Sequence, residues 1–380
     1  MRHKRSQGTL PRRAALKAGA LAAAALAGGR RVRPARAQDD EPFDPGGRVR
    51  IDYDETISFN ELYGYPPMLG RVEGWVVRVV AEAGDYYNVI DWVRYDEVLP
   101  IYAAVHAESP FPHNDVWFDI GRGYVHSSMV VPVREEFQQP EPVIGDGFWG
   151  EITVPTSWQH WEPKLRSQRY FDLAYGCVFR VIDRADEPDG RAWYRILDDI
   201  SPSSSWWVQA THVRRVQPGE FNPISPDVPP EGKRIEVNIG EQLLTCYEGE
   251  TPVFTTRISS GTYFRDNEGN LHQFNTPYGE HIVIRKMPSR HMIGGEEIDD
   301  YYNLPGVPWC TFFTHRGAAI HGTYWHNDFG RPRSHGCVNV TNDAAKWVYR
   351  WTNPFAGYED ANRRTASEER EIATRIIVTR

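Results

Sequence analysis

Apolar and polar residues alternate over short runs through most of the chain after residue 68. The clearest runs lie in the C-terminal part, at 234–239, 242–247, 253–258, 281–284 and 375–378. Such alternation predicts half-buried β-strands. One segment differs, because Ala345, Val348 and Trp351 recur with helical spacing after Asn342 and Asp343, so we expect a helix at 341–351. The pattern indicates a mostly β protein with one or two helices.

Two stretches in the first half of the chain repeat each other. One runs from Trp117 to Val133 and the other from Trp193 to Val216, and both end in aromatic-Val-x-small-hydroxyl-x-Val-x-x-Val. Short strands separated by Gly, Asp and Pro predict two small β-barrels, at 69–147 and 148–217. They resemble bacterial Src-homology-3-like (SH3-like) modules, which implies rigid spacers or possible wall binding, and the sequence leaves both open.

The N-terminal residues have the features of an export signal. Residues 1–37 contain ten Lys or Arg and no acidic residue, with Arg12-Arg13 ahead of an alanine-rich core. This pattern predicts a cleavable, twin-arginine-like signal and a location outside the cytoplasm, in the cell wall or periplasmic space. The apolar core is short for a membrane span, so we expect no stable span after cleavage. An N-terminal extension at 38–68 follows.

Charge narrows the range of partners. The whole chain carries −8, and without the signal 33 basic residues face 51 acidic ones, a net charge of −18. Such a surface repels phosphate backbones and anionic lipids, so we expect no nucleic-acid partner. A proline-rich run at 218–231 predicts a stiff linker, which leaves 232–380 as the last domain.

The candidate chemistry lies in the run Ser334-His335-Gly336-Cys337. A cysteine nucleophile reacts as thiolate and needs a neighbouring base. His321, with fifteen residues between it and Cys337, and His335 are both candidates from the sequence. Gly336 permits an unusual turn that would direct backbone N–H groups at a developing oxyanion.

The spacing of His321 and Cys337 within S-H-G-C-V-N resembles the active-site signature of YkuD-type L,D-transpeptidases. The resemblance covers about 232–380 and implies a β-sandwich catalytic domain without metal or organic cofactor. It implies that Cys337 is the nucleophile, that His321 is the general base oriented by the Gly322 carbonyl, and that His335 and Gly336 shape the oxyanion pocket. The substrate-binding residues that we predict are Ser334, Asn339, Tyr324 and Trp325.

The implied reaction joins peptidoglycan stem peptides, as donor and acceptor, in 3→3 cross-links through a cysteine acyl-enzyme. Two alternatives remain from the sequence: an L,D-carboxypeptidase that hydrolyses the same bond, and a wall-binding protein with secondary catalysis. A zinc site from His315, His321, His335 and Cys337 is disfavoured, because the spacings match no compact metal motif. The other cysteines, Cys177, Cys246 and Cys310, are predicted to be structural.

Overall fold

The structure is a computed structural model that describes residues 57–58, 68–200, 204–265, 269–295 and 301–380. The predicted export signal at 1–37 and nearly all of the extension at 38–68 lie outside these residues. Within the described part, no helix is long and apolar enough to cross a membrane.

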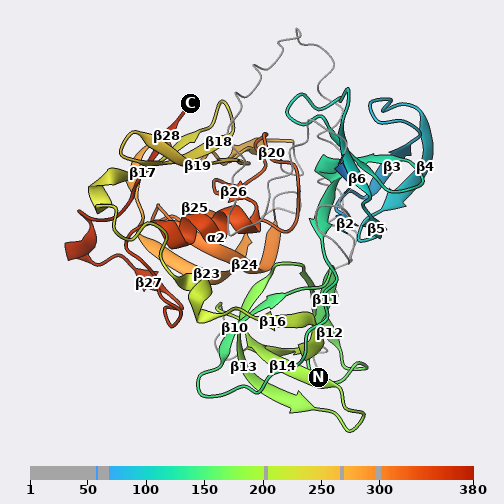
Figure 1. Cartoon of the computed structure of the whole chain (residues 1–380), viewed down its shortest axis with the longest axis horizontal. Coiled ribbons are helices and arrows are strands. Elements are labelled where there is room, and N and C mark those ends of the chain that lie inside the picture. Colours follow the sequence, from blue (N-terminus) through green and yellow to red (C-terminus); the bar gives the residue numbers. More distant parts are fainter. Residues whose placement is uncertain (1–56, 59–67, 201–203, 266–268, 296–300) are drawn as a thin grey trace, which may run out of the picture.

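The chain forms two small β units and a larger C-terminal unit (Figure 1). Module 1, blue to cyan, contains β2 (Leu69–Val72), β3 (Val76–Val80), β4 (Val89–Arg94), β5 (Val98–Pro100), β6 (Ala103–His106), β7 (Val116–Asp119), β8 (Tyr124–His126), η1 (Ser127–Met129) and β9 (Val130–Val133), with β1 (Ile57–Ser58) added to β6. Module 2, green, contains β10 (Phe148–Ile152), β11 (Thr156–His160), β12 (Arg169–Ala174), β13 (Val178–Asp186), β14 (Ala192–Leu197), β15 (Ser205–Gln209), η2 (Ala210–His212) and β16 (Val213–Arg215).

The two modules share one pattern of strand pairing. In module 1, β2 pairs with β5 and β9, and the order β6-β7-β8-β3-β4 follows. In module 2, β10 pairs with β13 and β16, and the order β13-β14-β15-β11-β12 follows. Gly70 and Gly150 hold equivalent places, since a Cβ on them would lie 2.4 Å from Val130 Cγ1 and 2.5 Å from Val213 Cγ1. The internal repeat is therefore present in the structure.

The closed barrels that the sequence predicted are not found among the described residues. The strands of module 2 form one 7-stranded sheet that ends at β12 and β16, and those of module 1 fall into two sheets. Alternating apolar residues predict that a strand has a buried face, but they do not determine which edges meet. The SH3-like assignment stays a prediction.

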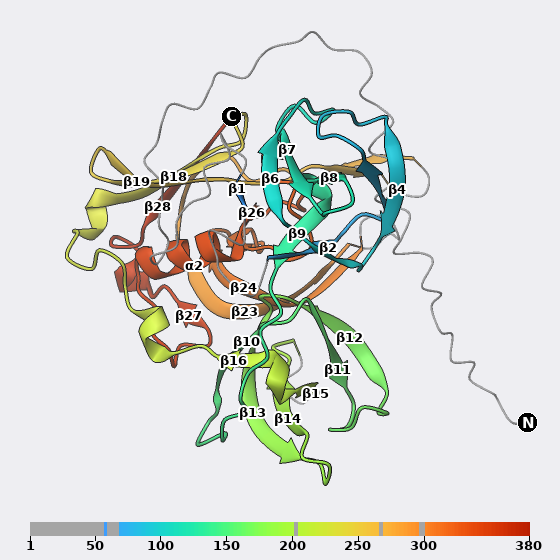
Figure 2. The same cartoon turned by 45° about the vertical axis from the view of Figure 1, so that its right-hand side comes forward.

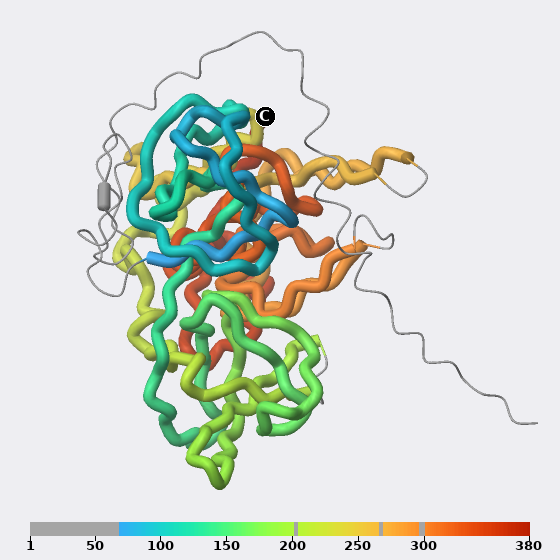
Figure 3. Tube along the Cα trace, turned by 90° about the vertical axis from the view of Figure 1, so that its right-hand side faces the viewer, coloured from blue at the N-terminus to red at the C-terminus, as the bar shows by residue number. Residues whose placement is uncertain are grey.

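The C-terminal unit packs two five-stranded sheets around one helix (Figure 2). One sheet has the order β19-β18-β17-β28-β22, and the other β26-β25-β24-β23-β27. Two hairpins project from this unit (Figure 3), and they are formed by β20 with β21 and by the far ends of β23 and β24. The elements are η3 (Pro218–Phe221), η4 (Pro230–Gly232), β17 (Lys233–Asn238), β18 (Leu243–Glu248), β19 (Thr251–Arg257), β20 (Tyr263–Arg265), β21 (Leu271–Gln273), β22 (Gly279–Ile282), β23 (Arg285–Gly294), β24 (Tyr302–Phe312), β25 (Ala319–Gly322), β26 (Val338–Val340), α2 (Asn342–Trp351), β27 (Arg363–Arg364), η5 (Ser367–Glu369) and β28 (Arg375–Thr379).

Helix α2 lies where the sequence predicted it. Its N-cap is Thr341, whose hydroxyl accepts a hydrogen bond from the N–H of Ala344 at 3.3 Å. At the other end, two buried lysines satisfy terminal carbonyls: Lys233 Nζ donates to Trp351 O at 3.0 Å, and Lys286 Nζ to Thr352 O at 2.7 Å. Because Lys233 lies on β17 and Lys286 on β23, these hydrogen bonds fix the end of the helix to both sheets.

Module 2 shares a hydrophobic core with the C-terminal unit, whereas module 1 has a core of its own. The shared core joins Phe179 and Val181 of module 2 to Met287, Val307 and Phe312 of β23 and β24. The predicted linker at 218–231 also packs on the C-terminal unit, through the buried Phe221.

Candidate functional site

The two residues predicted to react lie on neighbouring strands. Strands β25 and β26 pair in parallel, with Ile320 opposite Val338 and His321 opposite Asn339. Cys337 directly precedes β26, and its Sγ lies 3.8 Å from the carbonyl oxygen of Gly317, just before β25. The pairing therefore places the strand that carries His321 beside the segment that begins just after Cys337, although fifteen residues separate the two in the chain.

His321 is held as a neutral imidazole. It is buried, and its Nδ1 donates to the carbonyl oxygen of Gly322 at 3.0 Å. Burial lowers the pKa of His321 to about 4, and the hydrogen bond to Gly322 opposes this shift only in part. With the proton on Nδ1, the lone pair of Nε2 is available to accept a proton at neutral pH.

Cys337 is held as a neutral thiol. Its side chain is partly exposed, yet desolvation raises the pKa of the thiol to about 11, and a backbone hydrogen bond from Ala319 opposes the rise. A thiol with this pKa is almost wholly protonated at neutral pH, so it reacts only if a base removes the proton. Both candidate residues are therefore uncharged at neutral pH.

The loop that presents Cys337 is braced from within. Ser334 Oγ donates to the carbonyl oxygen of Cys337 at 2.6 Å and accepts the N–H of Gly336 at 3.2 Å. Thr276 Oγ1 donates to the same carbonyl at 3.4 Å. Gly336 has φ +108°, which strongly favours glycine. The Gly336 N–H is thus engaged inside the loop, so this residue shapes the oxyanion region through its turn.

His335 is packed among aromatic rings. It stacks on Phe264 of β20, with ring centroids 3.9 Å apart and an interplanar angle of 11°. Phe274, which follows β21, and Tyr302 of β24 lie beside the same ring, with centroids 4.8 and 4.7 Å from that of His335. Both projecting hairpins therefore hold His335, and this stacking favours His321 as the base.

Three of the four residues predicted to bind substrate are turned into the protein. Ser334 braces the loop, as described above. Tyr324 is buried and donates its hydroxyl to Pro305 O at 2.7 Å, and Asn339 is buried with Nδ2 3.0 Å from His326 Nε2. These hydrogen bonds hold the loop between β25 and β26, while Asn339 Oδ1 is buried without a hydrogen-bond partner among the described residues. Trp325 differs, since it is half-buried and its ring centroid lies 5.7 Å from that of His321.

Sequence reasoning missed a buried carboxylate in this loop. Asp328 is 1% exposed and lies 2.6 Å from His113 Nε2 of module 1, 2.7 Å from Arg333 Nη1 and 3.2 Å from Arg331 Nε. Burial alone would raise the pKa of Asp328, but the hydrogen bond from His113 and the charges of Arg333 and Arg331 hold it below its ordinary range. The only sequence signal was an aspartate followed closely by two arginines.

Both modules contact the candidate site. Besides the His113–Asp328 pair, Asn327 Nδ2 of the loop donates to Ser127 O of module 1 at 3.1 Å. On the other side, the loop of module 2 at 198–200 binds the β23–β24 hairpin, with Asp198 Oδ2 2.7 Å from His291 Nδ1. The modules thus hold the two sides of the site.

The described residues contain no group of three or more His, Cys, Asp or Glu side chains placed to bind a metal ion. His315 lies in an exposed turn between β24 and β25. The other three cysteines, Cys177, Cys246 and Cys310, are buried and free.

Fold and site together define a β domain with a buried, neutral histidine on β25 and a protonated thiol just before the neighbouring strand β26. Residues 232–376 match the family model for the L,D-transpeptidase catalytic domain, YkuD, and they carry that domain. The predicted YkuD-type domain is thereby confirmed for this segment.

A relative is YciB of Bacillus subtilis (strain 168), a protein named as an L,D-transpeptidase, which is 28% identical over 134 residues. The match covers 33% of this chain and 63% of YciB, so it spans less than two thirds of that relative.

Three solved structures are also similar. The L,D-transpeptidase of Xylanimonas cellulosilytica DSM 15894 is 25% identical, with 39% of this chain and 60% of that chain covered and a TM-score of 0.28. The Mycobacterium smegmatis enzyme is 21% identical, with 39% and 59% covered and a TM-score of 0.29. L,D-transpeptidase 3 of Mycobacterium tuberculosis is 18% identical, with 61% and 82% covered and a TM-score of 0.29. TM-scores this low carry no argument, and the family assignment rests on the sequence match.

The neutral resting pair predicts a pH dependence. With His321 as the predicted base for acylation of Cys337, the rate should be level near neutral pH and fall as pH drops through about 4, the pKa of the buried imidazole. Mass spectrometry of the intact protein, from acid to neutral pH, gives the rate of acylation and so measures this fall. A fall at the ordinary histidine pKa of about 6.5 would contradict the burial argument.

The hydrogen bond from His113 of module 1 to Asp328 predicts that a substitution in module 1 changes stability and acylation. His113→Ala removes a hydrogen bond to a buried carboxylate, so we expect a loss of about 1–3 kcal/mol in the free energy of unfolding and slower acylation. Thermal unfolding and acylation rates measure both. His106→Ala is the control, because His106 pairs with the exposed Asp115 at 2.8 Å on the same module. Equal effects of the two substitutions would contradict the role assigned to the His113–Asp328 hydrogen bond.

Proposed function

We propose that the protein is a peptidoglycan L,D-transpeptidase that forms 3→3 cross-links through an acyl-enzyme on Cys337. The observation that carries this proposal is the neutral His321, whose Nδ1 is bonded to Gly322 O and whose strand lies beside the thiol. The family match at 232–376 supplies the reaction class.

In the first step, Nε2 of His321 accepts the thiol proton while Sγ attacks the carbonyl carbon of the L-centre of diaminopimelate. Backbone N–H groups of the loop ending at Cys337 stabilise the oxyanion. When the intermediate collapses, the bond to the terminal D-alanine breaks, and the imidazolium returns the proton to the leaving amine. The products are a thioester on Cys337 and free D-alanine.

In the second step, the side-chain amine of another stem attacks the thioester. His321 accepts a proton from the attacking amine and returns it to the departing sulfur. The new amide is the cross-link, and the free thiol is restored. If water takes the place of the amine, the same thioester gives the L,D-carboxypeptidase reaction, so muropeptides formed with and without an amine acceptor distinguish the two.

The assignment of roles predicts different losses for the two histidines. Cys337→Ala should abolish turnover and covalent labelling by a carbapenem. His321→Ala should slow acylation by about 10²–10⁴-fold, because it removes proton transfer. His335→Ala should retain a pH profile of the normal shape, because its ring is packed among Phe264, Phe274 and Tyr302. A His335 variant that alone shifts the titration of the thiol would reverse the two roles.

We further propose that the protein is exported to the wall space by the twin-arginine route. The proposal rests on Arg12-Arg13 and the weakly apolar core that follows them. Arg12→Lys with Arg13→Lys should leave the precursor in the cytoplasm, which fractionation and immunoblotting measure. Normal export of this double variant would indicate the general secretory route.

A further inference from the structure

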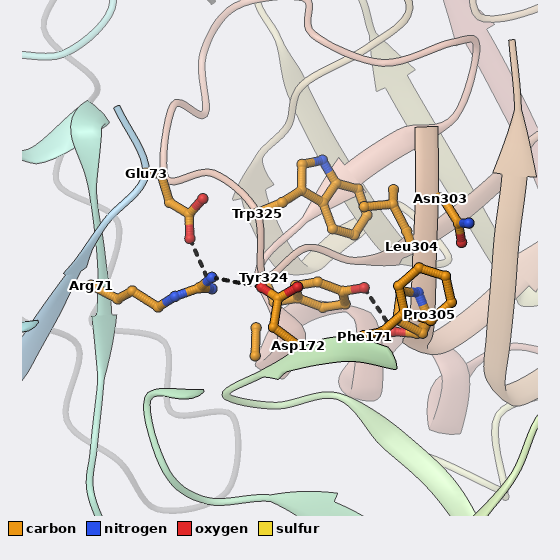
Figure 4. A pocket seen from close by; sticks show the side chains of 10 residues that line it. Arg71, Glu73, Phe171, Asp172, Asn303, Leu304, Pro305, Tyr324 and Trp325 are labelled. Carbon is orange, nitrogen blue, oxygen red and sulfur yellow. Dashed lines mark hydrogen bonds and ion pairs between the residues drawn. The ribbon is translucent and has the colours of Figure 1, made fainter. Parts of the chain in front are cut away.

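A small cavity of about 100 Å³ lies where the three units meet (Figure 4). Module 1 contributes Arg71 and Glu73, module 2 contributes Asp172 of β12, and the loop after β25 contributes Tyr324 and Trp325. The cavity belongs to no single unit, so it exists only because both modules are docked.

The charges around this cavity are unbalanced. The buried guanidinium of Arg71 lies 3.0 Å from Glu73 Oε1, 2.7 Å from Asp96 Oδ1 and 3.6 Å from Asp172 Oδ2. Three carboxylates therefore share one cation, and two of them, Glu73 and Asp172, line the cavity. Since Asp96 does not line it, only Glu73 and Asp172 can reach a bound group.

Glu73 has an acceptor that the protein does not satisfy. Its side chain is 10% exposed, and Oε1 accepts no hydrogen bond from the described residues, although Arg71 lies close enough for an ion pair. Burial raises the pKa of Glu73 to about 7, and Arg71 opposes this rise. A buried carboxylate in this position is stabilised by any further cation or hydrogen-bond donor that enters.

The cavity also borders the candidate site. Trp325 lines it and lies 5.7 Å, between ring centroids, from His321. Trp325 thus lines the cavity and also lies near the candidate base. The face of a tryptophan ring also attracts cations.

We propose that this cavity is a subsite for an ammonium group of a peptidoglycan stem peptide, held between the carboxylates of Glu73 and Asp172. An ammonium offers three N–H donors, and the space suits the end of an aliphatic chain. The excess of carboxylates disfavours anionic groups. The inference rests on the proposed function, because both donor and acceptor stems carry amines.

The test compares carboxylates that share the same arginine. Glu73→Gln and Asp172→Asn remove a charge that faces the cavity, whereas Asp96→Asn, the control, removes a charge that pairs with Arg71 outside it. Binding of a diaminopimelate-containing tetrapeptide is measured by calorimetry in the Cys337→Ala background, which needs no turnover. We expect about tenfold or more weaker binding for the two cavity variants and little change for Asp96→Asn.

The same peptide acetylated on its free side-chain amine should bind weakly to every variant alike. Equal losses in all three variants, a failure of the parent to bind, or equal losses for free and acetylated peptide would overturn the subsite.

Two kinetic measurements on the enzyme that retains Cys337 show whether the ammonium belongs to the donor or to the acceptor stem. A higher KM for the donor in acylation assigns it to the donor stem, and a higher KM for the amine in the transfer step assigns it to the acceptor. Labelling of Cys337 by a β-lactam without a cationic group should be unchanged in all variants. If that labelling is absent from the unsubstituted protein, the proposed function fails, whereas the calorimetry still decides the subsite.

Discussion

The parallel pairing of β25 with β26 is the constraint on which the rest of the site depends. It places His321 opposite Asn339, which follows Cys337 by two residues, and a shift of one residue would turn each side chain to the other face. Parallel strands cannot be joined by a tight turn, so a long crossover must connect them. Here the crossover is the loop at 323–337, and it carries the buried Asp328 and the positive-φ turn at Gly336. The stability of this loop therefore sets the geometry of the reacting pair.

That loop is held mostly by residues from elsewhere in the chain. Ser259 Oγ donates to Asp328 O at 3.0 Å, and His113 binds the Asp328 side chain from module 1. Module 2 supports the opposite side through apolar contacts, with Phe179 against Gly306 and the Cys177 thiol directed at Pro305 O. The modules were expected to be spacers or wall-binding units. Their contacts show that they also form part of the walls around the candidate site, whatever else they bind.

Burial separates the protonation states of the two reacting groups. It lowers the pKa of His321 to about 4 and raises that of Cys337 to about 11, so the resting site carries no ion pair. A neutral pair avoids the cost of burying two charges, and charge then develops only when a substrate is bound. A protonated thiol is also a poor nucleophile, and it is oxidised more slowly than a thiolate. The same burial therefore keeps the imidazole of His321 neutral and lowers the reactivity of the Cys337 thiol when no substrate is bound.

The sequence alone determined the mostly β class, the internal repeat and helix α2, and it singled out Cys337 with two histidines as candidate bases. These features are local, because each depends on periodicity or on a short run of residue types. The sequence could not show that Ser334, Tyr324 and Asn339 face inward, since polarity does not reveal which groups find partners inside the protein. It also could not show that the sheet of module 2 ends at β12 and β16 without closing into a barrel. Nor could it show that His113 binds Asp328, which is 215 positions away along the chain. Only tertiary packing decides these contacts, because burial and pairing depend on segments that meet after folding.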